Sequence, residues 1–387
     1  MVTGAVICEF NPFHNGHKYL LDEMKRDGCD CIVAVMSTSF TQRGDVAVYS
    51  KFTRAEDALK GGADIVIELP VVWAVSSAQR FAKAGCEIIK ALGCVDRVYF
   101  GSESGDIEKL IKATKATLDE KVNEITNTYM SQGDYYPCAL EKAVSEVYGK
   151  EVAQVLSTPN NTLAVEYIKA LKNSNIEIKT IKRVGAEHDS EEAAKGFASA
   201  SKLRQDILSE INTEGFVPES NGECDNPAFY EYSERAVLYA LRNMSAESFE
   251  KTPDVSEGLH NRIYETVCRH NSIGEILTEI KTKRYTLARL RRILTCALLG
   301  ITKEHQIMQV PYIRVLGFSS CGELLLKKAK ATASLPLVVN FAKDYQLLDA
   351  NAKQIAELEI KATNLRTVFE KSPTECNQDF TNGIIKI

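Results

Sequence analysis

Residues 7–20 decide the fold of this chain, and they read Ile7-Cys8-Glu9-Phe10-Asn11-Pro12-Phe13-His14-Asn15-Gly16-His17-Lys18-Tyr19-Leu20. The apolar run 5–8 is typical of a buried strand, and a helical pattern starts at Lys18. Between them, Pro12, Asn15 and Gly16 predict a tight strand-to-helix turn. Such a turn directs unpaired backbone N–H groups and the positive end of a helix dipole beyond the carboxyl edge of the sheet. Open α/β sheets bind nucleotides at that edge.

Two histidines in this turn indicate phosphate chemistry. His14 and His17 are three positions apart, so both imidazoles can point at one phosphate, and Gly16 leaves room for a ligand. Fixed donors at this place suit attack on the α-phosphate of a nucleoside triphosphate, because charge grows on the phosphate oxygens and on the departing pyrophosphate. The alternative is that both histidines are helix-end residues with satisfied hydrogen bonds.

Apolar strands and helices alternate along the following residues. We expect further strands at residues 31–36, 64–69, 97–100 and 176–181. This alternation predicts an α/β fold with a mainly parallel sheet covered on both faces. Between residues 214 and 229 the composition shifts to Gly, Pro, Ser, Asn and acidic residues. We therefore predict a Rossmann-like domain over 1–215 and a mostly α-helical domain over 216–387.

The composition is ordinary for a globular protein. The 387 residues are 44% hydrophobic and 26% charged, with a net charge of −5. The 11 cysteines include no C-x-x-C pair, which argues against a zinc site or a disulfide scaffold and favours reduced thiols. No stretch has the length and apolarity of a membrane span, and no signal peptide is evident, so we expect a cytoplasmic protein.

Positive charge is concentrated in one C-terminal stretch. Residues 281–330 contain eleven Lys or Arg and two acids, Glu304 and Glu323. A helical projection places an apolar face on one side and a row of cations on the other, which favours binding of a phosphate backbone over an ordinary solvated face. The predicted RNA contacts are Lys281, Lys283, Arg284, Tyr285, Arg289, Arg291 and Arg292. Tyr285 can either stack on an unpaired base or pack in the core.

Two motifs resemble those of the nucleotidyltransferase superfamily. Residues 10–17 resemble the F-[DN]-P-x-H-x-G-H version of the H-x-G-H motif, and Ser199-Ala200-Ser201-Lys202-Leu203-Arg204 resembles the S-x-[ST]-x-[ILV]-R element that closes the triphosphate site. Its hydroxyls and guanidinium suit pyrophosphate oxygens, and a helix cap at Ser199 or Ser201 is expected in any case. The chain departs from the common Thr-Phe-Asp-Pro sequence at Glu9 and Asn11, and Asn11 removes a negative charge beside the phosphates. The resemblance implies that residues 1–215 form a nucleotidyltransferase domain.

Further stretches resemble the bacterial tRNA(Met) cytidine acetate ligase family. They are residues 9–17, Gln42-Arg43-Gly44, Ile67-Glu68-Leu69-Pro70, Phe100-Gly101-Ser102-Glu103, Pro159-Asn160-Asn161, Lys283-Arg284-Tyr285-Thr286 and Pro311-Tyr312-Ile313-Arg314. The resemblance implies an enzyme that makes acetyladenylate from ATP and acetate. It also implies transfer of the acetyl group to N4 of the wobble cytidine of elongator tRNA(Met), which gives N4-acetylcytidine.

The same resemblance implies particular ATP contacts. They are residues 7–20, Gly101, Asn161, Arg183, Ser199, Ser201 and Arg204, with Lys51 and Arg54 as weaker candidates. His14 and His17 would hold the phosphates and are the expected catalytic residues. The Asn doublet leaves Asn160 as the alternative to Asn161. Mg²⁺ is expected to accompany the triphosphate, although no carboxylate cage for it is visible.

Two other functions remain open from the sequence. An adenylyltransferase acting on a small phosphorylated acceptor would share the histidine turn without needing the basic stretch. A nucleotide-sensing RNA-binding module would keep the nucleotide site and show no turnover. The sequence does not predict an oligomeric state.

Overall fold

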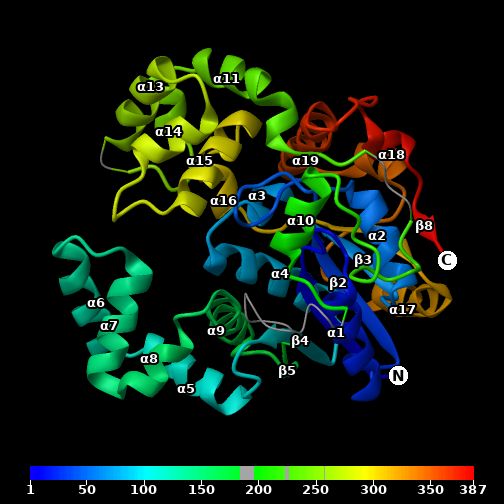
Figure 1. Ribbon diagram of the computed structural model, residues 1–387. Coiled ribbons are helices and arrows are strands. Elements are labelled where there is room, and N and C mark those ends of the chain that lie inside the picture. Colours follow the sequence, from blue (N-terminus) through cyan, green and yellow to red (C-terminus); the bar gives the residue numbers. More distant parts are fainter. Residues whose placement is uncertain (184–195, 223–225, 257) are drawn as a thin grey trace.

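A central sheet runs through the protein, as Figure 1 shows for the computed structural model, which describes residues 1–183, 196–222, 226–256 and 258–387. In these residues the strand order is β5-β4-β1-β2-β3-β6-β7, and β8 pairs with β6. The strands are β1 (Thr3–Cys8), β2 (Cys31–Ser37), β3 (Ile65–Leu69), β4 (Arg97–Ser102), β5 (Glu177–Lys182), β6 (Ile313–Phe318), β7 (Leu337–Val338) and β8 (Ile385–Lys386). β1 to β5 are parallel, which confirms the predicted α/β fold.

Helices lie against both faces of the sheet and in two lobes beside it (Figure 1). Those near the sheet are α1 (Asn15–Arg26), α2 (Lys51–Lys60), α3 (Val71–Ala74), α4 (Ala78–Leu92), α9 (Pro159–Leu171) and α10 (Ala200–Leu208). The first lobe contains α5 (Ile107–Thr117), α6 (Glu120–Ser131), α7 (Tyr136–Tyr148) and α8 (Lys150–Val155). The second lobe contains α11 (Glu234–Arg242), α12 (Ala246–Glu250), α13 (Leu259–Arg269), α14 (Ile273–Ile280), α15 (Leu287–Leu299) and α16 (Lys303–Ile307). The C-terminal helices are α17 (Ser320–Thr332), α18 (Phe341–Asp344), α19 (Ala350–Val368) and α20 (Gln378–Thr381).

Two apolar cores form on opposite faces of the sheet because successive strand residues point in opposite directions. In β1, Ala5 and Ile7 belong to one core, and Val6 and Cys8 belong to the other. α1 and α2 cover the second core, while α4 and α9 cover the first. The sheet is therefore shielded on both faces, as its continuous apolar strands predict.

The strand order reverses at β1, which lies between β2 and β4. The chain moves outward from β1 through β2 and β3, then returns across the sheet to β4 and β5. A crevice opens at the carboxyl ends of the strands at such a reversal, and ligands of open α/β sheets bind in it. The histidine turn follows β1 directly, so the topology places it at this point.

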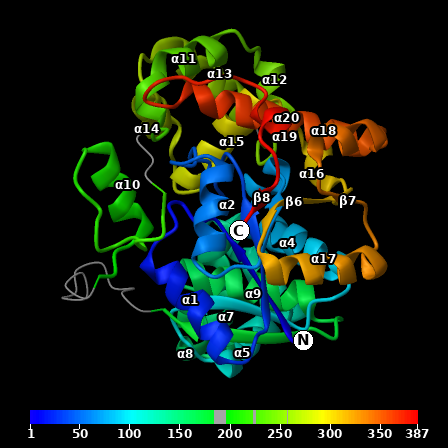
Figure 2. The ribbon, with the colours of Figure 1, turned by 90° about the vertical axis from the view of Figure 1, so that its right-hand side faces the viewer.

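The C-terminal residues return to the sheet, which corrects the predicted domain organisation. β6 pairs antiparallel with β3, and β7 and β8 pair with β6 (Figure 2). The sheet therefore extends beyond residues 1–215, and residues 216–387 are not a separate helical unit. The composition shift at 214–229, of which 223–225 lie outside the described residues, marks a long connection and not the end of the sheet.

A buried ionic cluster joins this C-terminal part to the rest. The Lys51 ammonium lies 3.0 Å from Glu68, 3.0 Å from Glu359 and 2.6 Å from Asp379. Arg314 on β6 also pairs with Glu68 at 3.0 Å and with Asp379 at 2.5 Å. Burial raises the pKa of Glu68 to about 7. Removing one buried partner would leave uncompensated charge, so the cluster holds β3, β6, α2, α19 and α20 together.

No described helix combines the length and the apolar sequence that a membrane crossing requires.

Candidate active site

The two histidines cap α1 and lie face to face. His14 is the N-cap residue, and its Nδ1 accepts a hydrogen bond from the Gly16 N–H at 3.0 Å. The His17 Nδ1 accepts from the His14 N–H at 3.4 Å, and the two ring centroids are 3.7 Å apart. A Cβ atom on Gly16 would lie 2.8 Å from His14 Cε1, so glycine is needed to leave room for the ring. The alternative that the histidines are helix-end residues with satisfied hydrogen bonds is therefore correct for their Nδ1 atoms. It does not account for Nε2 of His14.

The cap also determines which nitrogen of His14 carries the proton. Because Nδ1 accepts, the neutral ring must carry its hydrogen on Nε2, where it can be donated to a ligand. Burial and, to a smaller extent, the charges of Arg183 and Arg204 together lower the pKa of His14 to about 3. Burial also lowers the pKa of His17, and the charges of His14 and Arg183 lower it by smaller amounts. Near neutral pH the site thus combines two neutral imidazoles with two guanidinium groups, an arrangement that attracts an anion.

Aromatic residues of the motif support the rings. The Phe10 ring lies 4.9 Å from the His17 ring and meets Phe13 edge-on at 5.0 Å. Phe10 and Phe13 are fully buried, and Pro12 is buried beside them. Phe10 has a φ of 47°, a left-handed conformation that costs energy in a residue with a large side chain. The backbone is therefore held in an unfavourable shape at the place where the histidines are presented.

Asn15 attaches a distant segment to the motif. Its side-chain amide donates to the carbonyls of Gly196 and Gly215, both at 2.8 Å. The ring of Tyr19 meets the ring of Phe197 edge-on at 6.3 Å. The amide nitrogen of Asn15 thus positions the segment around α10, so a contact from Asn15 to a nucleotide would have to come from its side-chain oxygen or its backbone.

α10 brings the second motif against the first. Arg204 Nη1 donates to the Asn11 carbonyl at 2.9 Å, and Nη2 donates to Ser201 Oγ at 3.1 Å. Ser199 is the N-cap residue and accepts from the Lys202 N–H at 3.2 Å. The predicted cap is confirmed at Ser199, whose hydroxyl hydrogen can still be donated to a phosphate oxygen. The histidine turn and the Ser-Arg element, far apart in sequence, therefore meet at one crevice.

The ends of β4 and β5 form another wall. A Cβ atom on Gly101 would lie 3.2 Å from Arg183 Cγ, so the absence of a side chain brings the two residues together. Arg183 donates to Asn160 Oδ1 at 3.3 Å, and Asn160 donates to Glu103 at 2.6 Å. Asn161 is 4% exposed, and its Oδ1 accepts from the Glu103 N–H at 3.1 Å. Asn161 thus holds the backbone that follows β4, whereas Asn160 contacts Arg183 directly.

Several residues of the 7–20 stretch contribute packing. Ile7 and Cys8 are core residues of β1, and Leu20 packs against the core on the α1 face. Lys18 forms an ion pair with Asp22 at 2.9 Å, within the same helix. Contacts from these positions to a nucleotide would come mainly from backbone atoms.

Lys51 and Arg54, the weaker candidates, have structural roles instead. Lys51 belongs to the buried ionic cluster, and both side chains are at most 1% exposed. Arg54 donates to the carbonyls of Glu9 at 2.5 Å and Ser37 at 3.0 Å, and also to that of Thr38. Burial lowers its pKa to about 9. Arg54 thus ties the carboxyl ends of β1 and β2 together beneath the crevice.

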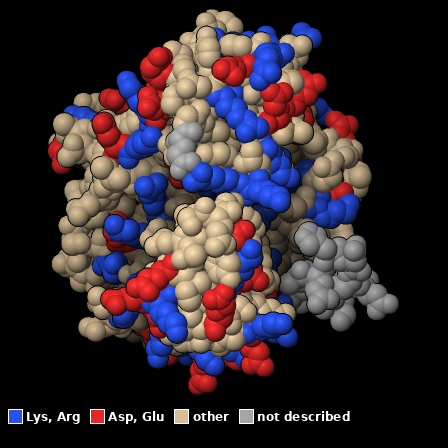
Figure 3. All heavy atoms as spheres, turned by 90° about the vertical axis from the view of Figure 1, so that its left-hand side faces the viewer, with Lys and Arg blue, Asp and Glu red and all other residues tan. Residues whose placement is uncertain are grey.

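The predicted RNA contacts between residues 281 and 292, the basic stripe, are divided between a loop and a helix. Residues 281–286 form the loop between α14 and α15, and Thr286 caps α15. The prediction that one helix covers this whole stretch is therefore wrong, and Leu287 in the first turn of α15 is 38% exposed. The exposed cations are Lys281, Lys283, Arg284 and Arg291. Figure 3 shows Lys and Arg side chains gathered in the hollow between the two helical lobes.

Acidic residues pair with part of this stripe. Arg289 donates to the Asp254 carbonyl at 2.6 Å, and Arg292 pairs with the Asp254 carboxylate at 3.2 Å. Tyr285 is 8% exposed, with the Arg289 guanidinium 4.9 Å from its ring centroid. Tyr285 is thus a packing residue in this structure, one of the two alternatives that the sequence left open.

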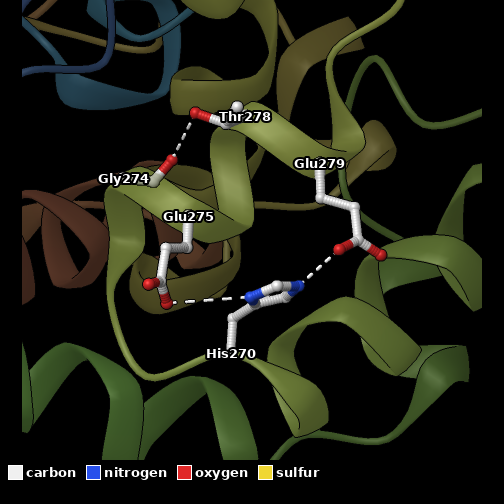
Figure 4. Close-up of a pocket in the computed structure, with 5 residues that line it drawn as sticks. All are labelled: His270, Gly274, Glu275, Thr278 and Glu279. Carbon is white, nitrogen blue, oxygen red and sulfur yellow. Dashed lines mark hydrogen bonds and ion pairs between the residues drawn. The ribbon is translucent and has the colours of Figure 1, made fainter.

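Two other clusters lie away from the crevice. A hollow of about 550 Å³ between α13 and α14 holds His270 between Glu275 and Glu279 (Figure 4). The ligand atoms of Cys31, Asp64 and Cys321 lie within 4.8 Å of one another, but at the amino ends of β2 and β3. Asp64 already pairs there with the Lys25 ammonium at 2.6 Å.

Comparison with known proteins gives one consistent result. The model of the HIGH Nucleotidyl Transferase family matches residues 1–380. A protein of Thermoanaerobacter sp. (strain X514) named tRNA(Met) cytidine acetate ligase is 37% identical, with 99% of each chain covered. A protein of Acetivibrio thermocellus with the same name is 35% identical, covering 98% of this chain and 99% of the relative.

Two solved structures of Thermotoga maritima TmcAL superpose on the whole chain. The apo form has a TM-score of 0.92 at 31% identity and covers 100% of both chains. The form bound with alpha-thio ATP has a TM-score of 0.90 at 31% identity, covering 100% of this chain and 99% of the other.

Proposed function

The chain belongs to the HIGH nucleotidyl transferases and, among them, to the tRNA(Met) cytidine acetate ligase family, and on this premise we propose that it acetylates RNA. ATP and acetate would give acetyladenylate. The acetyl group would then pass to N4 of the wobble cytidine of elongator tRNA(Met). The observation that carries this proposal is the meeting of His14, His17, Arg183 and Arg204 at the crevice beside β1.

In the first step an acetate oxygen attacks the α-phosphorus, and the bond to the leaving pyrophosphate breaks. Negative charge develops on the α-phosphate oxygens and on the pyrophosphate. The Nε2–H of His14 and the N-terminus of α1 would face this charge without needing to reorganise. Neutral histidines suffice as hydrogen-bond donors, so the step does not require them to gain a proton.

The outer phosphates would lie toward α10. Ser199, Ser201 and Arg204 present hydroxyl and guanidinium groups there, and a guanidinium can donate two parallel hydrogen bonds to a phosphate. We propose that ATP arrives with Mg²⁺. This ion usually keeps several waters and binds through substrate phosphates, so it needs few protein carboxylates.

In the second step the cytidine N4 attacks the acetyl carbonyl carbon, and AMP leaves. The amine loses one proton as the C–N bond forms. A wobble base is already unstacked or nearly so, which makes its delivery to the crevice inexpensive. Exposed Lys281, Lys283 and Arg284 would hold the RNA backbone. Because ATP and tRNA occur in the cytoplasm, we propose that the protein acts there.

Purified protein with ATP, labelled acetate and bulk tRNA tests this function. Label entering RNA as N4-acetylcytidine, together with acetate-dependent ATP–pyrophosphate exchange, is the expected result. Exchange that requires a phosphorylated small molecule would instead indicate an adenylyltransferase, and absence of turnover would indicate a nucleotide-sensing RNA-binding module.

Two variants separate the steps of the reaction. His17→Ala should abolish exchange and leave tRNA binding intact. Lys283→Glu should leave exchange intact and weaken tRNA binding, whereas Lys353→Glu on α19 serves as the charge-matched control. Equal tRNA affinity of the two lysine variants would contradict the assignment of the basic stripe.

A further inference from the structure

Residues 40–46 form a tight hairpin beside the crevice. Phe40 and Val46 pair as an antiparallel bridge. The Thr41 N–H donates to the Asp45 carbonyl at 2.9 Å, and the Gly44 N–H donates to the Thr41 carbonyl at 2.9 Å. Gly44 has a φ of 81°, which glycine adopts readily. The hairpin is therefore a well-defined support for Arg43 at its tip.

One side of this hairpin contacts the nucleotide motif. The Gln42 N–H donates to Glu9 Oε1 at 2.7 Å, and the Gln42 side chain donates to the Ser76 carbonyl at 2.8 Å. Burial raises the pKa of Glu9, and the charges of Arg204 and Arg43 act in the opposite direction. Arg43 directly follows Gln42 in the chain, so the bond from Gln42 to Glu9 holds it beside the motif.

The other side of the hairpin rests on α15. The Gly44 carbonyl accepts from Thr295 Oγ1 at 2.7 Å, and a Cβ atom on Gly44 would lie 2.6 Å from the Arg292 backbone nitrogen. Arg291 Nη1 pairs with Asp45 at 3.4 Å. The hairpin thus connects the nucleotide crevice with the first turn of the basic helix.

Arg43 at the hairpin tip and Arg291 on α15 both act electrostatically on Arg204. Burial lowers the pKa of Arg204, Asp45 and Glu9 oppose that effect, and the charges of Arg43 and Arg291 add to it. Arg43 is exposed, and in the part of the chain that the structure describes its guanidinium forms no hydrogen bond or ion pair. Asp45 lies 3.4 Å from Nη1 of Arg291, whose guanidinium carries five N–H donors. Arg43 and the remaining N–H donors of Arg291 are therefore available to bind a second anion, in addition to the triphosphate proposed to lie at Arg204.

We propose that Arg43 and Arg291 bind the backbone phosphate of the nucleotide that receives the acetyl group. This inference rests on the proposed function and assigns the acceptor side of the same site. Arg204 and the histidines serve the triphosphate on one side of the hairpin, and α15 faces the RNA on the other. A phosphate held between them would bring its base to the adenylate, so Arg43 is a positioning residue and Asp45 orients Arg291.

The test compares both half-reactions in Arg43→Gln, which keeps much of the side-chain length and removes the charge. Acetate-dependent ATP–pyrophosphate exchange should keep its rate and its KM for ATP. Transfer of acetyl to tRNA should fall by about 10- to 100-fold, the range for one lost charge-assisted hydrogen bond. The slope of log affinity for a single-stranded anticodon-loop RNA against log salt should become shallower by about 0.7 per lost phosphate contact.

Two further variants control the test. Arg43→Lys should recover part of the transfer rate, because a cation can still pair with phosphate as a point charge. Arg26→Gln, at the far end of α1, removes an exposed arginine and should change neither half-reaction.

Three outcomes would overturn the inference or the function separately. A raised KM for ATP in Arg43→Gln would mean that Arg43 serves the triphosphate. Unchanged transfer and an unchanged salt slope would mean that it binds no RNA phosphate. Absence of exchange in the unmodified protein would refute the proposed function, while the salt slope would still report whether Arg43 binds RNA.

Discussion

His14→Asn separates the two roles that the structure gives to one imidazole. The Nδ1 atom caps α1 by accepting the Gly16 N–H at 3.0 Å, while Nε2 carries the hydrogen that we propose is donated to the phosphate. Asparagine is among the best N-cap residues, so its side-chain oxygen can replace Nδ1. It has no counterpart to Nε2–H at the same reach. The variant therefore removes the proposed catalytic donor and keeps the cap.

The expected magnitudes follow from these two contacts. Loss of one donor to developing transition-state charge typically costs about 100- to 1,000-fold in rate, or about 2.7–4 kcal/mol. Loss of the ring contact with His17, whose centroid is 3.7 Å away, should lower the unfolding free energy by about 1 kcal/mol. His14→Ala should show the same loss of rate and about 1 kcal/mol of further destabilisation, because the cap is also lost.

Acetate-dependent ATP–pyrophosphate exchange at saturating ATP measures the first quantity, and urea unfolding of both variants measures the second. An exchange rate near that of the unmodified protein in His14→Asn would refute the role of Nε2–H. Equal stability of the Asn and Ala variants would refute the capping argument.

Three other predictions concern the fold, its pH dependence and the RNA face. Gly44→Ala should lower the unfolding free energy by about 2 kcal/mol or more, because its Cβ would lie 2.6 Å from the Arg292 backbone nitrogen. Gly28 has a similar positive φ, but no atom lies within 4 Å of an added Cβ, so Gly28→Ala measures the backbone strain without a clash. Equal urea midpoints for the two variants would contradict the clash at Gly44. Burial raises the pKa of Glu68 from 4.5 to about 7, so the folded state binds more protons and stability is lost as pH rises through that range. Glutamine does not titrate, so the unfolding free energy of Glu68→Gln should not fall in this way, and the difference between the variant and the unmodified protein should change in favour of the variant as the pH rises from 4.5 to 7. Urea unfolding at several pH values measures this difference, and a difference independent of pH would contradict the assignment. Asp254→Asn removes the carboxylate that pairs with Arg292 and should strengthen tRNA binding by roughly two- to fivefold in a filter-binding titration. Unchanged affinity would place Arg292 outside the RNA face.

The histidine site could be predicted because its parts are close in sequence. β1, the turn and α1 are consecutive, so the apolar run, Pro12 and Gly16 specify the geometry of His14 and His17 locally. The Ser-Arg element was also recognisable, since Ser199 caps its own helix.

Contacts between distant residues were not accessible in the same way. Residues 313–318 read as a short apolar run, and nothing local indicates that they pair with β3 at the sheet edge. Lys51 and Arg54 face buried carboxylates and carbonyls supplied by other elements, and a helix pattern does not reveal such partners. The contacts of Asp254 with Arg289 and Arg292 could not be predicted either, because Asp254 belongs to a different segment of the chain.

The sequence alone thus determined the parallel α/β core, the strand–turn–helix corner and the family, because hydrophobic periodicity and turn residues act over short stretches of chain. Only the tertiary structure decided that the chain's end completes the sheet and that the 40–46 hairpin joins the nucleotide crevice to α15. These features depend on which buried charges and backbone groups find partners across the fold, and such pairing is set by the packing of the whole molecule.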